Sequence, residues 1–255
     1  MTSQLVPGRR QKEVSVDTSE LSGSGSHPVQ VHLTVAQVAT VAMPILVPAA
    51  MRQVFRATHR RWGPRRGQQA GFAIYWATCW ATAATLLGPR RLVRLWQRSV
   101  VPLPAPKALA WAALSVPPVG ALTTQWFPHV RAAGPVAVAV AVGVGATNAV
   151  AEEALWRGAP VAMFGSDPVL GWLWPAVGFT LWHLVPLNAS SATRPREVET
   201  LLGAVLIGFG HGWLAWRTRS LTATSVAHAL TDACGVEPVR RIWLSTPPGQ
   251  TRIVQ

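Results

Sequence analysis

Seven side chains that can carry charge or bind metal fall within stretches that otherwise have the composition of membrane spans. Such groups are costly in hydrocarbon, so in membrane proteins they usually face the bundle interior and mark a functional site. The chemistry open to them is proton transfer by a carboxylate, ion pairing, and metal binding by imidazole and carboxylate. They are Glu152, Glu153, Arg157, His183, His211, His228 and Asp232.

The motif at residues 151–158 contains two adjacent acids and an arginine. On a helix Glu153 and Arg157 are four residues apart and share a face, so their charges can pair. Glu152 is rotated by about 100° from its neighbour. We therefore expect a structural ion pair beside a free Glu152 that points into a cavity. The alternative is a helix end at the membrane interface with solvated charges.

Two further motifs carry histidines. Phe179 and His183 are four residues apart; a single histidine of this kind is either a ligand or a satisfied core residue. His228 and Asp232 also share a helical face, and can converge on a water, a substrate oxygen or a metal. The alternative for this pair is a buried hydrogen bond that holds the helix to its neighbour. Glu152 and His228 lie near the middle of their apolar runs, and His183 lies only about 7–8 Å beyond the middle of its own, so the three can meet.

The elements that must position these motifs are membrane helices. Of the 255 residues 49% are hydrophobic and only 13% are charged, which favours a membrane protein. We predict an all-α, polytopic transmembrane helix bundle with about seven or eight helices, because several apolar runs approach the roughly 20 residues of a span. The runs are 32–51, 70–87, 108–127, 136–164, 168–187, 201–216 and 221–236.

Some of these runs depart from a simple span. The run 136–164 is too long for one upright helix, so it should be tilted, broken near Pro160, or shared between two segments. The last two runs are short and close together, and we expect a tight helical hairpin. Residues 188–200 should form a polar loop.

The net charge of +13 lies mainly in loops and tails. Arginines that flank apolar spans are explained by membrane topology and contact with anionic lipid, so lipid is an expected partner and nucleic acid is not. Residues 90–101 are expected to lie along the membrane interface as a basic amphipathic helix. Cys79 and Cys234 suggest neither a disulfide framework nor a metal knuckle.

The expected organisation has three parts. Residues 1–30 form a disordered polar tail, 31–236 a helical membrane domain with a motif-bearing core at 135–236, and 237–255 a short exposed tail. The protein should be a multi-pass protein of the cell membrane.

The strings EExxxRG, FxxxH and HxxxD, in this order in apolar helices, resemble the CPBP family of CAAX-prenyl-protease-like and bacteriocin-processing-like membrane proteins. The similarity covers about residues 135–236. It implies an all-helical intramembrane endopeptidase in which Glu152 activates water, supported by Glu153 and Arg157. His183 would help to bind that water or a metal, and His228 and Asp232 would serve as metal ligands or stabilise the oxyanion.

Several details of the site depend on this resemblance. If a divalent metal such as Zn²⁺ is bound, the implied ligands are Glu152, His183, His228 and Asp232; without metal the histidines act as hydrogen-bonding partners. The family often has Asn at the position of Asp232, and an aspartate there favours a cation. Trp156 and Trp182 are bulkier than the residues common beside these motifs, which predicts a narrower cavity. His211 does not match the family pattern and is left outside the expected site.

The preferred function is an intramembrane endopeptidase that acts on an apolar or membrane-anchored peptide. The alternative is a non-catalytic membrane protein of the same fold that binds a peptide or partner in an immunity or scaffold role. A small transporter with a buried proton path is a third hypothesis, disfavoured because no internal symmetry is visible.

Overall fold

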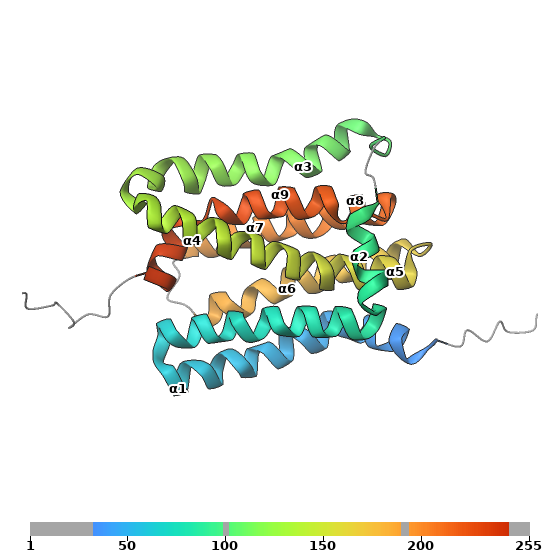
Figure 1. Ribbon diagram of the computed structural model, residues 1–255, viewed down its shortest axis with the longest axis horizontal. Helices are drawn as coiled ribbons and strands as arrows, with labels where there is room; N and C mark the ends of the chain where they lie inside the picture. The colour runs from blue at the N-terminus through green and yellow to red at the C-terminus, as the bar shows by residue number, and fades with distance from the viewer. Residues whose placement is uncertain (1–32, 99–101, 190–193, 245–255) are drawn as a thin grey trace, which may run out of the picture. The chain divides into compact units, whose positions relative to one another are not determined.

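The computed structural model describes residues 33–98, 102–189 and 194–244. The chain divides into two units, Met1–Leu33 and Thr34–Gln255, and the fold described here is that of the second unit. Over the described ranges it consists of helices without strands, which confirms the predicted all-α class (Figure 1). The tail expected at residues 1–30 lies outside the described residues.

The first helix, α1 (Val35–Leu87), is a hairpin of two long arms. Gly63 has a φ of 73°, a conformation that favours glycine, and it divides the arms. Pro64 follows directly, where a helix start tolerates its missing N–H. The arms approach closely at Gly67, where an added Cβ would lie 2.6 Å from the Cα of His59.

A short amphipathic helix, α2 (Pro89–Gln97), follows α1 and runs across the direction of the long helices (Figure 1). Leu92 and Leu95 are buried, whereas Arg91 and Arg94 are exposed. This is the amphipathic pattern expected for residues 90–101, of which the structure describes residues 90–98.

The remaining elements alternate α-helices with short π-helical turns (η), in which an N–H bonds to the carbonyl five residues earlier. The next part of the chain forms α3 (Lys107–Ala121), η1 (Leu122–Trp126), α4 (Phe127–Glu153), η2 (Ala154–Gly158) and α5 (Ala159–Phe164). It continues with η3 (Val169–Leu173), α6 (Trp174–Ala189), α7 (Arg194–Leu206), η4 (Ile207–His211) and α8 (Gly212–Thr218). The last elements are α9 (Thr222–Ala233), α10 (Val236–Val239) and η5 (Arg240–Leu244).

The long run at 136–164 is a continuous helix formed by α4, η2 and α5, and it does not break at Pro160. Instead, the helix widens into the π-turn η2 just before the proline, where Ala159 N donates to Ala154 O. A proline removes one backbone donor and crowds the preceding turn, and a local change of helical register accommodates it. The wide turn therefore falls directly after the two acids of the first motif.

Two expectations about polar segments differ from the structure. Residues 194–200, expected within a loop, form the start of α7. Residues 237–244, expected as part of an exposed tail, are helical and pack against α1. The Trp243 ring stacks on Trp76 with 6.0 Å between centroids, and Gln69 Nε2 donates to Ile242 O at 2.7 Å. A ring contact and a hydrogen bond to a distant helix thus hold a segment that was expected to be exposed.

The last two runs form helices that follow each other closely in the chain, α8 and α9, whereas their packing against each other as a hairpin stays a prediction. The turn between α8 and α9 includes Arg219 in the left-handed conformation, with a φ of 56°. Residues 219–221 make up the whole connection between α8 and α9.

Four helical stretches are long and apolar enough to cross a membrane: Val35–Leu87, Lys107–Phe164, Val169–Ala189 and Glu197–Thr218. Gly63 and Gly134, both with positive φ, divide the first two. Large apolar side chains are exposed along these helices, for example Ile45 at 58% and Leu202 at 60%, whereas charged residues occupy the interior. An exposed apolar surface around a polar interior suits lipid rather than water, so the chain is an integral membrane protein.

Two helix contacts position the motifs. The helix α4 packs along α9, and α1 packs along α6. At Gly145 of α4 an added Cβ would lie 2.6 Å from the Ala233 N of α9, so only glycine allows this approach. The core beside the motifs is aromatic and includes Tyr75, Trp156, Phe179 and Trp182.

Candidate active site

Buried ionisable side chains gather where the end of α4 and the turn η2 meet η4 and α9. Each of these side chains has a relative exposure of 2% or less. The members are Glu152, Glu153, Arg157, His211 and His228. We call these five residues the buried cluster.

Glu153 is the centre of the buried cluster. Its Oε1 lies 3.1 Å from His228 Nδ1, 3.4 Å from Arg157 Nη1 and 3.8 Å from His211 Nδ1. Glu153 and Arg157 therefore lie close enough to form the ion pair that their spacing predicts. Arg157 also donates to Ile207 O at 3.0 Å, and its guanidinium carbon lies 4.0 Å from the centroid of the Phe179 ring. These contacts tie η2 to η4 and α6.

Glu152 has one oxygen held and one oxygen without a hydrogen-bond partner among the described residues. Its Oε1 accepts from Tyr75 OH at 3.0 Å and from Trp182 Nε1 at 2.9 Å. Trp156 Nε1 donates in turn to Tyr75 OH at 2.8 Å. The other oxygen of Glu152, Oε2, has no hydrogen bond among the described residues and lies 3.4 Å from His228 Nε2. The two tryptophans, expected only to narrow the cavity, thus also orient the carboxylate directly or through Tyr75.

His228 lies between carboxylates on both sides of its ring. Because Glu153 can only accept, His228 Nδ1 donates to it. The other nitrogen, Nε2, faces Glu152 Oε2 at 3.4 Å and Asp232 Oδ2 at 3.6 Å. Two carboxylates around one nitrogen require a proton or another cation between them.

Asp232 connects the buried cluster with the outside of the bundle. Its side chain is 25% exposed, whereas His228 is 1% exposed. Asn148 Nδ2 donates to Asp232 Oδ2 at 2.8 Å, and Trp76 Nε1 donates to Asn148 Oδ1 at 2.8 Å. Water or substrate that reaches His228 from this side would first meet Asp232.

His183 lies at the edge of the cluster. Its Nδ1 donates to Phe179 O at 2.8 Å, since a carbonyl only accepts, and this leaves Nε2 as the acceptor of the neutral ring. The Phe179 ring contacts both imidazoles, with centroid distances of 4.6 Å to His183 and 5.8 Å to His228. The structure thus brings five of the six expected site residues into a chain of direct contacts. The sixth, His183, is separated from His228 by the Phe179 ring.

Sequence reasoning missed several members of this site. His211 is 0% exposed, and neither of its ring nitrogens has a hydrogen-bond partner among the described residues. The signal was present, because a histidine inside an apolar run is itself costly, but no motif contains it. Tyr75 and Asn148 gave no signal, because their role depends on contacts between distant helices.

The residues present fit a divalent metal. Glu153, His211 and His228 each offer a ligand atom, and these atoms lie within 4.8 Å of one another. Glu153 Oε2 and both nitrogens of His211 are buried without hydrogen bonds among the described residues. Two imidazoles and one carboxylate are also a donor set that suits Zn²⁺. Of the ligands implied by the sequence resemblance, this group contains His228.

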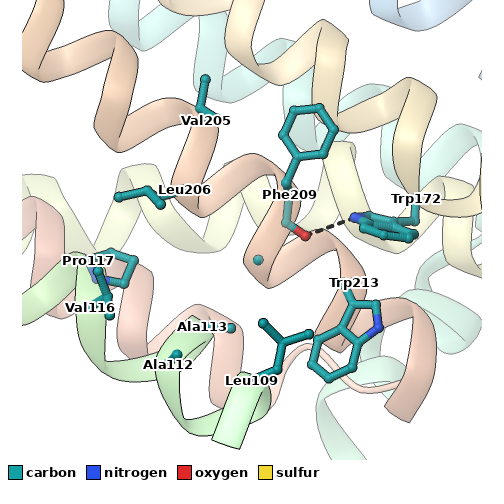
Figure 2. A pocket seen from close by; sticks show the side chains of 11 residues that line it. Leu109, Ala112, Ala113, Val116, Pro117, Trp172, Val205, Leu206, Phe209 and Trp213 are labelled. Carbon is teal, nitrogen blue, oxygen red and sulfur yellow. Dashed lines mark hydrogen bonds between the residues drawn. The ribbon is translucent and has the colours of Figure 1, made fainter. Parts of the chain in front are cut away.

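A separate apolar pocket of about 390 Å³ lies between α3 and η4. Figure 2 shows its walls, which include Ala112, Val116 and Leu206, and the bond from Trp172 Nε1 to Phe209 O at 2.8 Å. Its lining carries no ionisable side chain, so it is distinct from the buried cluster. It is nevertheless adjacent, because Phe209 and Gly210 line it and His211 follows them in η4.

Comparison with known proteins gives one family match. The family described as type II CAAX prenyl endopeptidase Rce1-like matches residues 134–234, which include all three motifs and His211. No curated protein and no solved structure matches the chain. The family match, which falls on the residues that form the buried cluster, supports the assignment of the chain to the CPBP, or CAAX-protease-like, family.

Proposed function

We propose that the protein is an intramembrane endopeptidase of the CPBP type, which hydrolyses a peptide bond near the membrane with a water activated by Glu152. The observation that carries this proposal is the state of the Glu152 carboxylate. It is buried, one oxygen is held by Tyr75 and Trp182, and the other faces His228 without a hydrogen-bond partner among the described residues. A fixed carboxylate with one free oxygen is suited to take a proton from water.

In the proposed reaction, water attacks the peptide carbonyl while Glu152 Oε2 takes its proton. Glu152 then gives this proton to the leaving amine, so the carboxylate is regenerated. His228 Nε2, when protonated, donates to the tetrahedral oxyanion, and Asp232 on the same side stabilises the imidazolium. A part for His183 in binding the attacking water, which the sequence resemblance implies, stays a prediction, because the Phe179 ring contacts both His183 and His228.

Glu153 and Arg157 act as positioning residues in this scheme. Glu153 accepts from His228 Nδ1 and thereby fixes which nitrogen faces Glu152. Arg157 balances the charge of Glu153 and ties η2 to η4 through Ile207 O.

We further propose a metal-bound form of the same site, in which Glu153, His211 and a neutral His228 hold a divalent metal such as Zn²⁺ and the ion takes the place of the imidazolium charge. When bound, such an ion activates water and polarises a carbonyl oxygen. The ligand set implied by the sequence resemblance, Glu152, His183, His228 and Asp232, stays a prediction. The two sets differ most clearly in the part they give to His183 and His211.

The proposed substrate is an apolar or membrane-anchored peptide, and the proposed location is the cell membrane. The apolar pocket beside η4 would receive an apolar part of the substrate, because its wall continues into the turn that carries His211. The variant Ala112→Trp would fill this pocket and should raise KM several-fold for an apolar substrate while kcat is kept. An unchanged KM would exclude the pocket from substrate binding.

The proposed activity is tested by cleavage of a membrane-anchored reporter by purified protein in lipid. Wild type is compared with Glu152→Gln, which keeps the shape and an acceptor oxygen, and with Glu199→Gln, the same change on an exposed residue of α7. We expect a loss of about 10² to 10⁴-fold for the first variant and none for the second. If folded wild type binds the peptide without cleaving it, the non-catalytic alternative is favoured.

Metal binding is tested separately from cleavage. Metal content and the visible absorption of the Co²⁺-loaded protein are measured for wild type, His211→Asn, His183→Asn and the control His129→Asn. We expect loss of the metal and of the absorption band in His211→Asn alone. Loss in His183→Asn with retention in His211→Asn would support the ligands implied by the sequence instead.

A further inference from the structure

Arginine side chains from two distant parts of the chain line one pocket of about 230 Å³. Three of them, Arg91, Arg94 and Arg98, come from α2 and its end, and Arg219 comes from the turn between α8 and α9. The other walls are apolar residues of α2 and α5. We call this the arginine pocket.

The backbone around the arginine pocket is tied together by hydrogen bonds. Leu221 N donates to Leu95 O at 3.0 Å, and Thr222 Oγ1 donates to Trp96 O at 2.6 Å. Ser220 Oγ donates to Arg98 O at 2.7 Å. The helix α2 is thus fixed against the turn between α8 and α9, and Figure 1 shows it beside α5 and α8.

Two of the four arginines already have a structural task. Arg91 Nη2 donates to Ala162 O, and Arg219 donates to Val161 O and Gly165 O. Free carbonyls at the end of a helix need such donors, so these two side chains cap α5. Arg94 and Arg98 do not cap α5 among the described contacts. Arg94 Nε donates to Arg90 O at 3.3 Å, which leaves the Nη groups of Arg94 and the guanidinium of Arg98 for a ligand.

The pocket holds positive charge without a counter-charge from the described part of the chain. Its lining contains no Asp or Glu, and none of its four arginines forms an ion pair there. Other arginines do so, since Arg157 pairs with Glu153, and Arg241 with Glu237. Four cations around one small volume repel each other unless an anion lies among them, and the planar guanidinium matches the oxygens of a phosphate.

The position of the pocket indicates the source of that phosphate. Three candidate spans, Val35–Leu87, Lys107–Phe164 and Glu197–Thr218, end close in sequence to residues that line the pocket. The ends of spans lie at the depth of the lipid headgroups, where basic residues meet anionic lipid. We propose that the arginine pocket binds the phosphate of an anionic lipid headgroup, independently of catalysis.

The test measures binding of phosphatidylglycerol, with phosphatidylcholine as reference, to the full chain in detergent micelles. The variant Arg94→Gln/Arg98→Gln removes the two arginines that do not cap α5, so the fold should be retained, which its melting temperature checks. Its control, Arg60→Gln/Arg61→Gln, removes the same charge from exposed positions near Gly63, at the turn between the arms of α1.

We expect wild type to prefer phosphatidylglycerol, a loss of about 30-fold in the first variant, and less than about threefold in the control. Restoring the charge with Arg94→Lys/Arg98→Lys should recover only part of the affinity, because lysine lacks the guanidinium fork. An equal loss in both Gln variants would overturn the proposal, since it would show only a general attraction of a basic protein. Binding of inorganic phosphate as tight as that of the lipid would overturn the assignment to a headgroup.

Discussion

The buried cluster and the arginine pocket are both rich in charge, but they balance it in opposite ways. In the buried cluster, Glu153 contacts Arg157, His211 and His228, and each of these groups has an acid within 4 Å. In the arginine pocket only like charges meet, and acids are missing from its lining. Charges that are removed from solvent need partners in the protein, whereas charges at helix ends can be balanced by lipid or ions.

This difference assigns the two regions different roles. The partners in the buried cluster come from α4, η2, η4 and α9, so its charges hold the fold together at the place where the chemistry is proposed. The positive charge of the arginine pocket is not balanced by acids in its lining, so the pocket is suited to bind an anion.

The largest expected difference between the regions is in stability. The variant Arg157→Met removes the only arginine of the buried cluster and leaves Glu153 buried without it. The free energy of unfolding should fall by about 3–5 kcal/mol. Arg94→Met relieves repulsion between the arginines of the arginine pocket, so the free energy of unfolding should stay unchanged or rise slightly. Denaturant unfolding in detergent measures both, and equal losses would show that the two regions do not differ as described.

A smaller effect is expected from the contact between α4 and α9. In Gly145→Ala the new Cβ would lie 2.6 Å from Ala233 N, so the helices must separate and His228 must move relative to Glu152. We expect a loss of about 1–3 kcal/mol in the free energy of unfolding and a lower rate of cleavage. The control is Gly143→Ala on the same helix, where an added Cβ meets no atom within 4 Å. If both variants behave alike, the close approach does not position the site.

The smallest effect concerns one hydrogen bond. Trp182→Phe removes one of the two hydrogen bonds to Glu152 Oε1, which is 2.9 Å long. Trp174→Phe removes a bond of similar length, 2.8 Å, from Trp174 Nε1 to Val41 O, away from the cluster. Each should lower the free energy of unfolding by about 1 kcal/mol. Only Trp182→Phe should also lower kcat, because it frees the carboxylate to rotate. A kcat that falls equally in both variants would contradict a role for Trp182 in orienting Glu152.

The helices and the motifs were predictable because they depend on local pattern. Apolar runs indicate which segments are helical, although the arginine-rich residues between the first two runs are helical as well, and the spacing of Glu153 and Arg157 puts both on one face. The different directions of Glu152 and Glu153 follow from the same helical geometry, whereas the cavity expected in front of Glu152 stays a prediction, and its carboxylate is held by Tyr75 and Trp182. The helical segments and the directions of the two acids need no knowledge of which helices are neighbours.

The features that sequence reasoning missed depend on contacts between distant segments. Tyr75 and Trp182 reach Glu152 from α1 and α6, and neither carries a motif of its own for this role. His211 meets Glu153 only because η4 packs against η2. Trp243 and Ile242 contact α1, although the arginines and prolines after Val236 favoured an exposed tail over residues 237–255.

The most direct test of the central claim is a double-mutant cycle on cleavage in lipid, with Glu152→Gln, His228→Asn and the double variant, each shown to be folded by its melting temperature. If the two residues act as one catalytic unit, the double variant should be about as slow as either single variant. Single variants that cleave like wild type, or losses that multiply as independent effects, would contradict the proposed active site.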